Sequence, residues 1–156
     1  MSSDVKRVAV TCGGFSGEAD ISRKSAAMVV KHMDRSRFVP TLVHIQSDGW
    51  HAEPSSGEKF PIDKGDFTYV DAQGDRHGFD VVFEMVHGTP GEDGRLSAYF
   101  ELIGLPYTAS QPRTLAIGHH KAWTTALLAR LGHPVANAGI FHKDVLKGLS
   151  ETASQL

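Results

Sequence analysis

Two glycine-rich segments contain the side chains that could do chemistry. Residues 13–20 read GGFSGEAD and include the carboxylate Glu18, and residues 87–94 read HGTPGEDG and begin with His87. Glycines let backbone N–H groups approach a ligand closely. The start of a helix that points at a pocket favours an anion. The second segment therefore predicts a site for a small anionic ligand.

Simpler interpretations of these residues stay open on spacing alone. Residues 87–94 are equally compatible with a tight turn that carries a solvated histidine. Glu18 near a helix start would favour the helix dipole by about 0.3–1 kcal/mol. Adjacent residues on a helix point about 100° apart, which favours an exposed pair over a metal site for His119 and His120. The first segment also lacks the G-x-G-x-x-G spacing, so we reject a nicotinamide dinucleotide site.

The elements that must position these segments are strands and helices. Residues 5–12 and 79–86 form apolar, β-branched runs, and the second run has the little alternation that suits a central strand covered on both faces. In open parallel sheets, ligands bind beyond the carboxyl ends of the strands. His87 follows directly after such an end, which favours it as a site residue.

Helices are expected after both segments. Ser16 is the expected cap of the first helix, with Asp20 in its first turn, and Asp93 is the expected cap of the second helix, which Gly104 ends. Apolar residues recur at helical spacing in each. In the first helix they are Ile21, Met28, Val29 and Met33, and in the second they are Leu96, Tyr99, Phe100 and Ile103.

The remaining segments extend an α/β fold. Residues 38–46 predict a strand that completes a right-handed β-α-β unit, with Pro40 at an edge or before regular pairing starts. Residues 49–73 predict short strands in hairpins, and residues 105–108 a brief strand. Two helical pieces over residues 111–132, a strand over 135–141 and a helix over 143–156 follow. We expect an open, mostly parallel sheet with helices on both faces over residues 1–111, and a second, incomplete domain over residues 112–156.

Composition narrows the class of protein. The chain has 156 residues, with 16 Lys and Arg against 18 Asp and Glu, for a formal charge of −2. No basic run stands out, so neither nucleic acid nor an anionic membrane is an expected partner. No apolar run approaches the length of about 20 residues that spans a bilayer, and the start lacks a secretory signal. The single cysteine, Cys12, is expected to be a small buried residue, and a reducing cytoplasm fits best.

Taken together, the motifs resemble a known family. GGFSGE with the following Ile21 and Ser22, HG with GEDG over residues 87–94, and ELIGLPYT over residues 101–108 resemble the amino-terminal part of D-alanine–D-alanine ligases in order and spacing. These enzymes belong to the ATP-grasp group. The resemblance implies a Rossmann-like pre-ATP-grasp domain over residues 1–111 and the start of an ATP-grasp domain over residues 112–156.

The resemblance also implies roles for single residues. Glu18 would bind the ammonium group of a first D-alanine, and His87 would hold its carboxylate or a developing acyl phosphate. Gly14 and Gly88 would belong to the same substrate-binding loops. Lys121 would contact the phosphates of ATP, although His120 stands before it where the family usually has an acidic residue. ATP and Mg²⁺ would serve the complete enzyme, whose metal ligands are expected outside this chain.

The length of the chain leaves alternatives. The resemblance implies further domains, so we expect a fragment that is inactive alone, in which unpartnered apolar faces around Trp123 and Leu127 favour a homodimer. A rival hypothesis is a stand-alone small-ligand-binding or dimerisation module of the same fold. A ligase that uses a hydroxy acid as its second substrate is a third, and the sequence does not separate it from the first.

Overall fold

A computed structural model describes residues 5–55 and 57–139 of the chain. The chain divides into two compact units, the first ending at Ala116 and the second beginning at Ile117. The two glycine-rich segments both belong to the first unit. The fold of that unit therefore decides whether their side chains meet.

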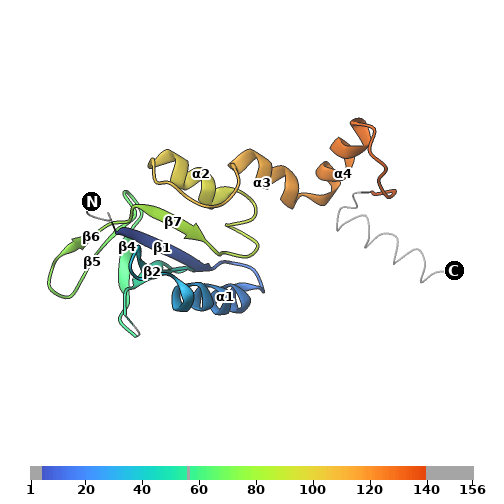
Figure 1. Cartoon of the computed structure of the whole chain (residues 1–156). Helices are drawn as coiled ribbons and strands as arrows, with labels where there is room; N and C mark the ends of the chain where they lie inside the picture. The colour runs from blue at the N-terminus through green and yellow to red at the C-terminus, as the bar shows by residue number, and fades with distance from the viewer. Residues whose placement is uncertain (1–4, 56, 140–156) are drawn as a thin grey trace. The chain divides into compact units, whose positions relative to one another are not determined.

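The first unit is built on one mixed sheet, with the strand order β6-β5-β4-β3-β2-β1-β7 (Figure 1). Strands β2, β1 and β7 run parallel, and β3 to β6 continue the sheet as an antiparallel meander. The strands are β1 (Lys6–Gly13), β2 (Phe38–Ile45), β3 (Trp50–Glu53), β4 (Phe60–Asp63), β5 (Thr68–Val70), β6 (Arg76–His77) and β7 (Val81–Glu84).

The α/β class and the early strands were predicted correctly, but the sheet is mixed rather than mostly parallel. The hairpins expected over residues 49–73 add their strands to this same sheet, which is why antiparallel pairs outnumber parallel ones among the described strands. Strand β2 pairs with β1 along its whole length, including Pro40, whereas its pairing with β3 starts only at Leu42. Pro40 thus stands before regular pairing on the β3 side, as its missing donor requires.

Strand β7 differs from the expected central strand. It lies at the end of the sheet, and beyond it only an isolated parallel bridge joins Val82 to Tyr107. It is nevertheless packed on both faces, since Val82 belongs to one apolar core and Phe83 packs against the other. The apolar run of residues 79–86 therefore reflects burial of both faces and not a central place in the sheet.

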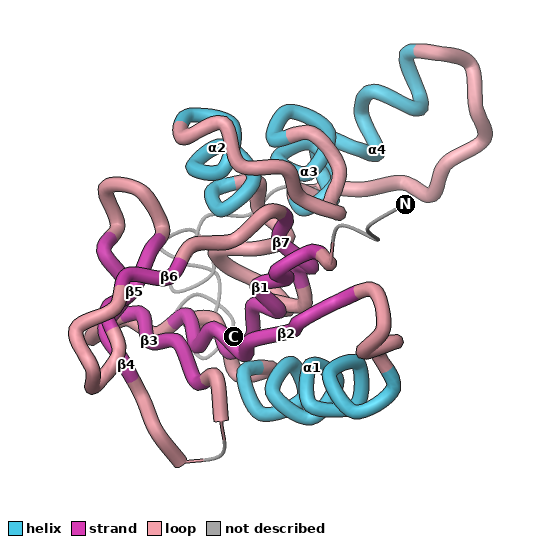
Figure 2. Tube along the Cα trace, turned by 60° about the vertical axis from the view of Figure 1, so that its left-hand side comes forward, coloured by secondary structure: helices cyan, strands magenta, loops and turns pink. Residues whose placement is uncertain are grey.

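The two helices of the first unit cover opposite faces of the sheet (Figures 1 and 2). Helix α1 (Ala19–His32) packs on the face that carries Val8, Val10 and Cys12, and helix α2 (Arg95–Leu102) packs on the face that carries Ala9. The alternation of side chains along β1 explains this division. Leu96 and Phe100 of α2 are buried and Gly104 follows its end with positive φ, both as predicted.

The apolar residues predicted for α1 are buried only in part. Val29 and Met33 pack against the core as predicted, whereas Ile21 and Met28 are exposed and the fully buried residues of α1 are Ser22 and Ala26. Small side chains at this spacing let the helix lie close to the strands. Ser22 consequently points into the interior.

The predicted caps are also wrong in detail. Glu18 occupies the N-cap position of α1 and Gly94 that of α2, and neither helix has a side-chain cap. The Ser16 hydroxyl instead bonds to the second loop, as described below. The Asp93 carboxylate, one residue before the N-cap Gly94, accepts the Arg95 backbone N–H at 3.2 Å. Ser16 lies two residues before the N-cap of α1, and Asp93 one residue before the N-cap of α2.

Two further helices follow, α3 (Pro112–His119) and α4 (Lys121–Arg130), which confirms the two helical pieces expected over residues 111–132. Residues 135–139 have no regular structure, and the rest of the predicted strand and the helix over residues 143–156 lie outside the described residues. Within the described part of the chain, no helix combines the length and apolar character that crossing a bilayer requires.

An aromatic cluster joins the antiparallel strands to α2. Phe67, fully buried, lies 5.1 Å from Phe100 and 6.1 Å from Trp50 in edge-to-face contacts, measured between ring centroids. Its backbone has a φ of 58°, which is uncommon for a bulky residue. The surrounding rings hold Phe67 in this conformation, and the cluster supports the helix that follows the second loop.

We predict that Phe67→Ala lowers the free energy of unfolding of this chain by about 3–5 kcal/mol, because it removes a large buried ring and leaves a cavity. Phe15→Ala, at an exposed phenylalanine, is the control and should change it by no more than about 0.5 kcal/mol. Urea unfolding followed by circular dichroism measures both. Equal midpoints for the two variants would contradict the central role of the cluster.

Candidate functional site

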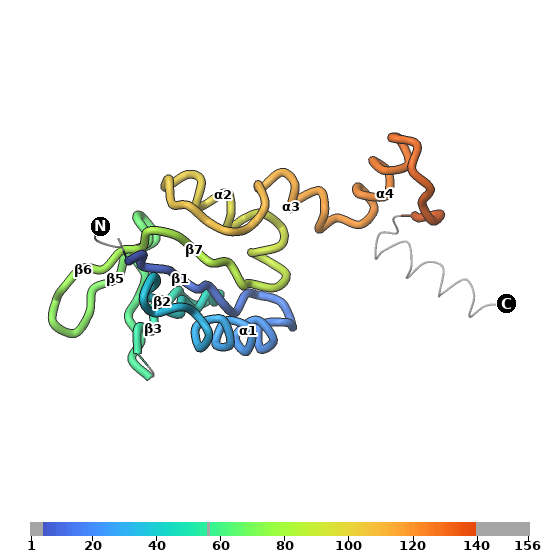
Figure 3. Tube along the Cα trace, viewed as in Figure 1, coloured from blue at the N-terminus to red at the C-terminus, as the bar shows by residue number. Residues whose placement is uncertain are grey.

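The two glycine-rich loops lie side by side at the carboxyl edge of β1 and β7 (Figure 3). The Phe15 backbone N–H donates to the Thr89 carbonyl at 2.8 Å, and the Ser16 hydroxyl donates to the His87 carbonyl at 3.1 Å. Residues more than 70 positions apart in sequence are thereby joined directly. The structure brings together the two segments that the sequence singled out separately.

Gly14 and Gly88 are the points of closest approach between the loops. A Cβ on Gly14 would lie 3.0 Å from the Thr89 carbonyl oxygen, and a Cβ on Gly88 would lie 2.6 Å from the Ser16 hydroxyl oxygen. Both have positive φ, of 104° and 69°, where side chains are strained. Any larger residue at either position would push the loops apart.

Glu18 stands at the end of the first loop and is exposed. Its Oε2 lies 3.6 Å from the position that a Cβ would take on Gly88, which places the carboxylate beside the second loop. The Glu18 backbone N–H donates to the Ser16 hydroxyl at 3.2 Å. Of the predicted site residues, Gly14, Glu18, His87 and Gly88 therefore lie together.

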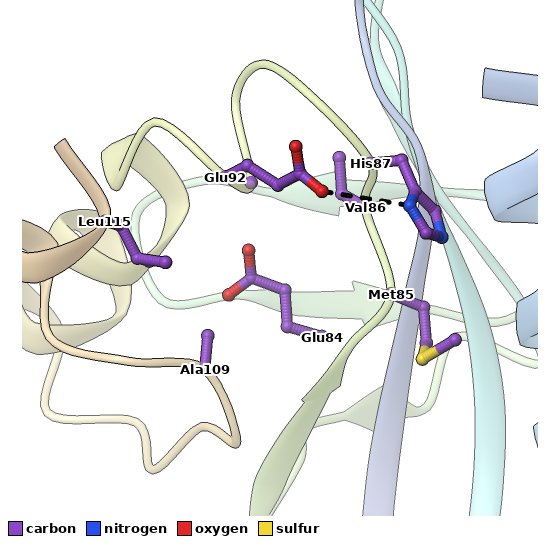
Figure 4. Close-up of a pocket in the computed structure, with 8 residues that line it drawn as sticks. Glu84, Met85, Val86, His87, Glu92, Ala109 and Leu115 are labelled. Carbon is purple, nitrogen blue, oxygen red and sulfur yellow. Dashed lines mark ion pairs between the residues drawn. The ribbon is translucent and has the colours of Figure 1, made fainter. Parts of the chain in front are cut away.

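His87 begins the second loop, and its Nδ1 lies 3.8 Å from Oε1 of Glu92 (Figure 4). Hydrogen bonds within the loop hold the rest of it in place, because the Thr89 hydroxyl donates to Oδ2 of Asp93 at 2.5 Å. Asp93 also pairs with Arg95 at 3.3 Å. The loop that carries the His87 imidazole is thus stabilised by hydrogen bonds and ion pairs among its own side chains and Arg95.

A cavity of about 220 Å³ opens beneath this loop and contains a carboxylate that the sequence analysis missed. Glu84, the last residue of β7, points to the side where Ala109 and Leu115 lie, away from His87 (Figure 4). Its Oε2 is buried and has no hydrogen-bond partner among the described residues. Burial, together with the nearby Asp93 charge, raises the pKa of Glu84 to about 7.

Cys12 lies close to the first loop but is not a candidate nucleophile. It is fully buried, as predicted, with Sγ 3.5 Å from Nδ1 of His44, whose Nε2 is 2.8 Å from Oε2 of Glu53. Burial raises the pKa of the Cys12 thiol to about 11 and lowers the pKa of His44. The thiol therefore stays protonated at neutral pH, and the three residues form a buried structural group.

Lys121, the expected ATP contact, belongs to the second unit. It is exposed and is the first residue of α4, and His120 before it accepts the Trp123 backbone N–H at 3.3 Å. Within residues 5–55 and 57–139, no group of three or more His, Cys, Asp or Glu side chains could hold a metal ion. The described site thus combines the carboxylates of Glu18 and Glu92, the imidazole of His87 and backbone groups.

A carboxylate, an imidazole and two glycine-rich loops thus meet at one edge of the sheet of an α/β domain, a combination that suits a small charged ligand. Comparison with known proteins gives the family. The family model described as "D-ala D-ala ligase N-terminus" matches residues 7–110. The chain is 39% identical over 142 residues to the D-alanine–D-alanine ligase of Flavobacterium psychrophilum, and 37% identical over 128 residues to that of Flavobacterium johnsoniae.

Solved structures agree with this assignment. The D-alanine–D-alanine ligase of Coxiella burnetii matches 96% of this chain with a TM-score of 0.79 and 29% identity, and the match covers 49% of that protein. The D-alanyl-alanine synthetase A of Vibrio cholerae, at 22% identity, shares the fold with a TM-score of 0.76 over 97% of this chain and 46% of its own. The chain therefore belongs to the D-alanine–D-alanine ligase family, within the family's amino-terminal region.

The chain spans only part of these relatives. The matched residues make up 90% of this chain but 43% of the Flavobacterium psychrophilum ligase, and 82% against 39% for the Flavobacterium johnsoniae ligase. The activity of a whole ligase is consequently a proposal for this chain.

We predict that Glu84→Gln raises the stability of this chain at pH 8 and leaves it nearly unchanged at pH 4. The pKa of Glu84 is raised to about 7 in the folded state from the ordinary value of 4.5. The contribution of Glu84 to stability is therefore fully present below pH 4.5 and is lost as the pH rises from 4.5 through 7. Since one pKa unit is worth about 1.4 kcal/mol, the gain at pH 8 should be roughly 1–3 kcal/mol.

Thermal unfolding of the two proteins across this pH range measures the difference. Glu58→Gln, at an exposed carboxylate whose Oε2 accepts a hydrogen bond from the Ser55 hydroxyl, is the control and should show no such pH-dependent gain. A gain for Glu84→Gln that is constant with pH would show that the carboxyl ionises normally.

Proposed function

We propose that this chain is the amino-terminal, substrate-binding part of an ATP-dependent ligase that joins two D-alanine molecules for peptidoglycan. The observation that supports this most is the position of Glu18 beside the loop that begins with His87, which offers an anion and an imidazole to the two charged ends of one amino acid. The curated relatives from Flavobacterium psychrophilum and Flavobacterium johnsoniae are named D-alanine–D-alanine ligases, which supports D-alanine as the substrate.

The proposed reaction has two steps. The carboxylate of the first D-alanine takes the terminal phosphoryl group of ATP, which gives an acyl phosphate and ADP. The amine of the second D-alanine, after losing a proton, attacks the acyl carbon, and inorganic phosphate leaves. The products are the dipeptide, ADP and phosphate. This chain's residues would serve the first D-alanine in both steps.

Glu18 would hold the ammonium group of the first D-alanine. An exposed carboxylate can form a charge-assisted hydrogen bond with an ammonium, which is about twice as strong as a neutral one. His87 would face the other end of the substrate. Because Nδ1 of His87 faces Glu92, Nε2 is the ring nitrogen available to a carboxylate or acyl phosphate oxygen. The imidazole would stabilise charge at that oxygen and would not act as a base.

ATP would be bound partly by Lys121, an exposed lysine at the first residue of α4. In this proposal residues 112–156 begin the ATP-grasp domain, and the ligands of Mg²⁺ lie outside the residues described. The chain by itself would then lack ligase activity, because it spans only 43% of the Flavobacterium psychrophilum ligase.

We predict that the complete protein encoded by the gene forms D-alanyl-D-alanine with ATP, and that these 156 residues alone do not. Glu18→Gln keeps the shape of the side chain but removes its charge, and should lower kcat/KM for D-alanine by about 10–10²-fold, since a charge-assisted contact is worth about 1.5–3 kcal/mol. His87→Gln should mainly lower kcat. Neither should change KM for ATP.

Release of phosphate and chromatography of the dipeptide measure these constants, with Glu58→Gln as the control for the loss of a carboxylate far from the loops. Normal kinetics in Glu18→Gln would contradict the assigned role of Glu18. D-alanine binding without any dipeptide formation by the complete protein would favour a stand-alone binding module instead.

We also propose that the chain forms a homodimer through the apolar residues of α4. The exposed fractions are 57% for Trp123, 46% for Leu127 and 64% for Leu131. Exposed apolar residues gathered on one short segment mark an interaction site.

Size-exclusion chromatography with light scattering should give the mass of a dimer for the wild-type chain. Trp123→Glu should shift it to the monomer, because burying an unpaired charge is costly. The control is Arg130→Glu, which places a glutamate at the last residue of the same helix and should leave the dimer intact. A monomer for the wild type at all concentrations would refute the dimer.

A further inference from the structure

Besides Ser16, whose hydroxyl bonds to the His87 carbonyl, a second side chain connects the two site loops, that of Ser22. It lies on the buried face of α1 and its exposed fraction is 0%. Its hydroxyl accepts the Gly13 backbone N–H at 2.9 Å and donates to the Met85 carbonyl at 2.6 Å. One hydroxyl group therefore bonds to the start of the first loop and to the residue two positions before His87.

The backbone of Ser22 adds a third connection. Its N–H donates to the Glu18 carbonyl at 3.0 Å, in the first turn of α1. Ser22 is thus bonded to Glu18 through its backbone N–H. Through its hydroxyl it is bonded to Met85, two residues before His87. The polar groups it satisfies, an N–H and a carbonyl at strand ends, would otherwise be buried without partners at a cost in free energy.

A second buried serine shows that this arrangement is not a general property of serines in this fold. Ser97, on α2, is also 0% exposed, yet its hydroxyl has no hydrogen-bond partner among the described residues. The two serines share residue type, burial and location on a helix that covers the sheet. They differ in that only the Ser22 hydroxyl joins the two loops.

We propose that Ser22 is a positioning residue, which fixes the distance between Glu18 and His87 and so makes the two loops one site for D-alanine. This inference rests on the proposed function. D-alanine is small, so its ammonium and carboxylate groups can engage Glu18 and His87 together only over a narrow range of separations. A displacement of about 1 Å at such a site can cost about 10²-fold in rate.

The kinetic test compares Ser22→Ala with Ser97→Ala in the complete protein. Ser22→Ala should lower kcat/KM for D-alanine about 10–100-fold and leave KM for ATP within about twofold of the wild type. Ser97→Ala should leave both constants unchanged. Equal effects of the two variants, or a loss in Ser22→Ala that affects D-alanine and ATP alike, would overturn the proposal, since a merely structural role predicts such results.

Hydrogen exchange of this chain tests the same connection without any activity. In Ser22→Ala the amides of Gly13 and of residues 85–89 should exchange at least about tenfold faster, while amides in β2 and in the body of α2 keep their wild-type rates. Ser97→Ala should leave the loop amides unchanged. Uniformly faster exchange, or no change at the loops, would overturn the proposal.

The two measurements separate this proposal from the proposed function. If the wild-type complete protein makes no dipeptide, the ligase assignment fails, and hydrogen exchange alone decides whether Ser22 couples the loops. If Ser22→Ala does not fold, Ser22→Cys, which keeps a weaker hydrogen-bonding group at the same position, replaces it. Its loss of kcat/KM for D-alanine should exceed that of Ser97→Ala, and an equal or smaller loss would overturn the proposal.

Discussion

The parallel pairing of β7 with β1 is the constraint on which the rest of the site depends. Its register places Val8 opposite Val81 and Thr11 opposite Glu84, so β7 ends two residues before β1 does, at the same edge of the sheet. The loops that follow must then emerge side by side. Two segments more than 60 residues apart become one site because four consecutive residues of β1 pair with the four residues of β7. The right-handed β1–α1–β2 connection keeps α1 on the face of the sheet opposite to α2.

This closeness determines which residues the loops can contain. Gly14 and Gly88 face backbone or side-chain atoms at distances that exclude a Cβ, and the loop backbones use each other as hydrogen-bond partners. The polar groups that would otherwise need water are satisfied within the site. Phe67 of the aromatic cluster packs against Phe100 of α2 and so fixes the helix that follows the second loop. The second loop is therefore anchored by β7 before it and by α2 after it.

The sequence predicted the elements that follow from strong local patterns and missed the residues whose roles arise from distant contacts. Apolar β-branched runs and glycine-rich turns located β1, β2, β7 and both loops, and the joint motifs located Glu18 and His87. Ser22 escaped notice as a site residue because a serine on a helix adds nothing to an apolar pattern, although it and Ala26 form the buried face of α1. The interior position of Ser16 could not be predicted either, because its partner is the His87 carbonyl.

Glu18 and Glu84 show how environment separates two identical side chains within one site. Glu18 stands exposed at a helix start, where a cationic group can reach it. Glu84 is held in a cavity beside Asp93 with one oxygen unpartnered, so that its charged form is disfavoured. Since the pKa of Glu84 is raised to about 7, this carboxyl is largely protonated below neutral pH and then adds little negative potential beneath the second loop. Glu18 and Glu92 are exposed carboxylates beside the loops, and Glu92 lies 3.8 Å from Nδ1 of His87. In the proposed function Glu92 would face the imidazole, which leaves Glu18 as the anion for an ammonium group.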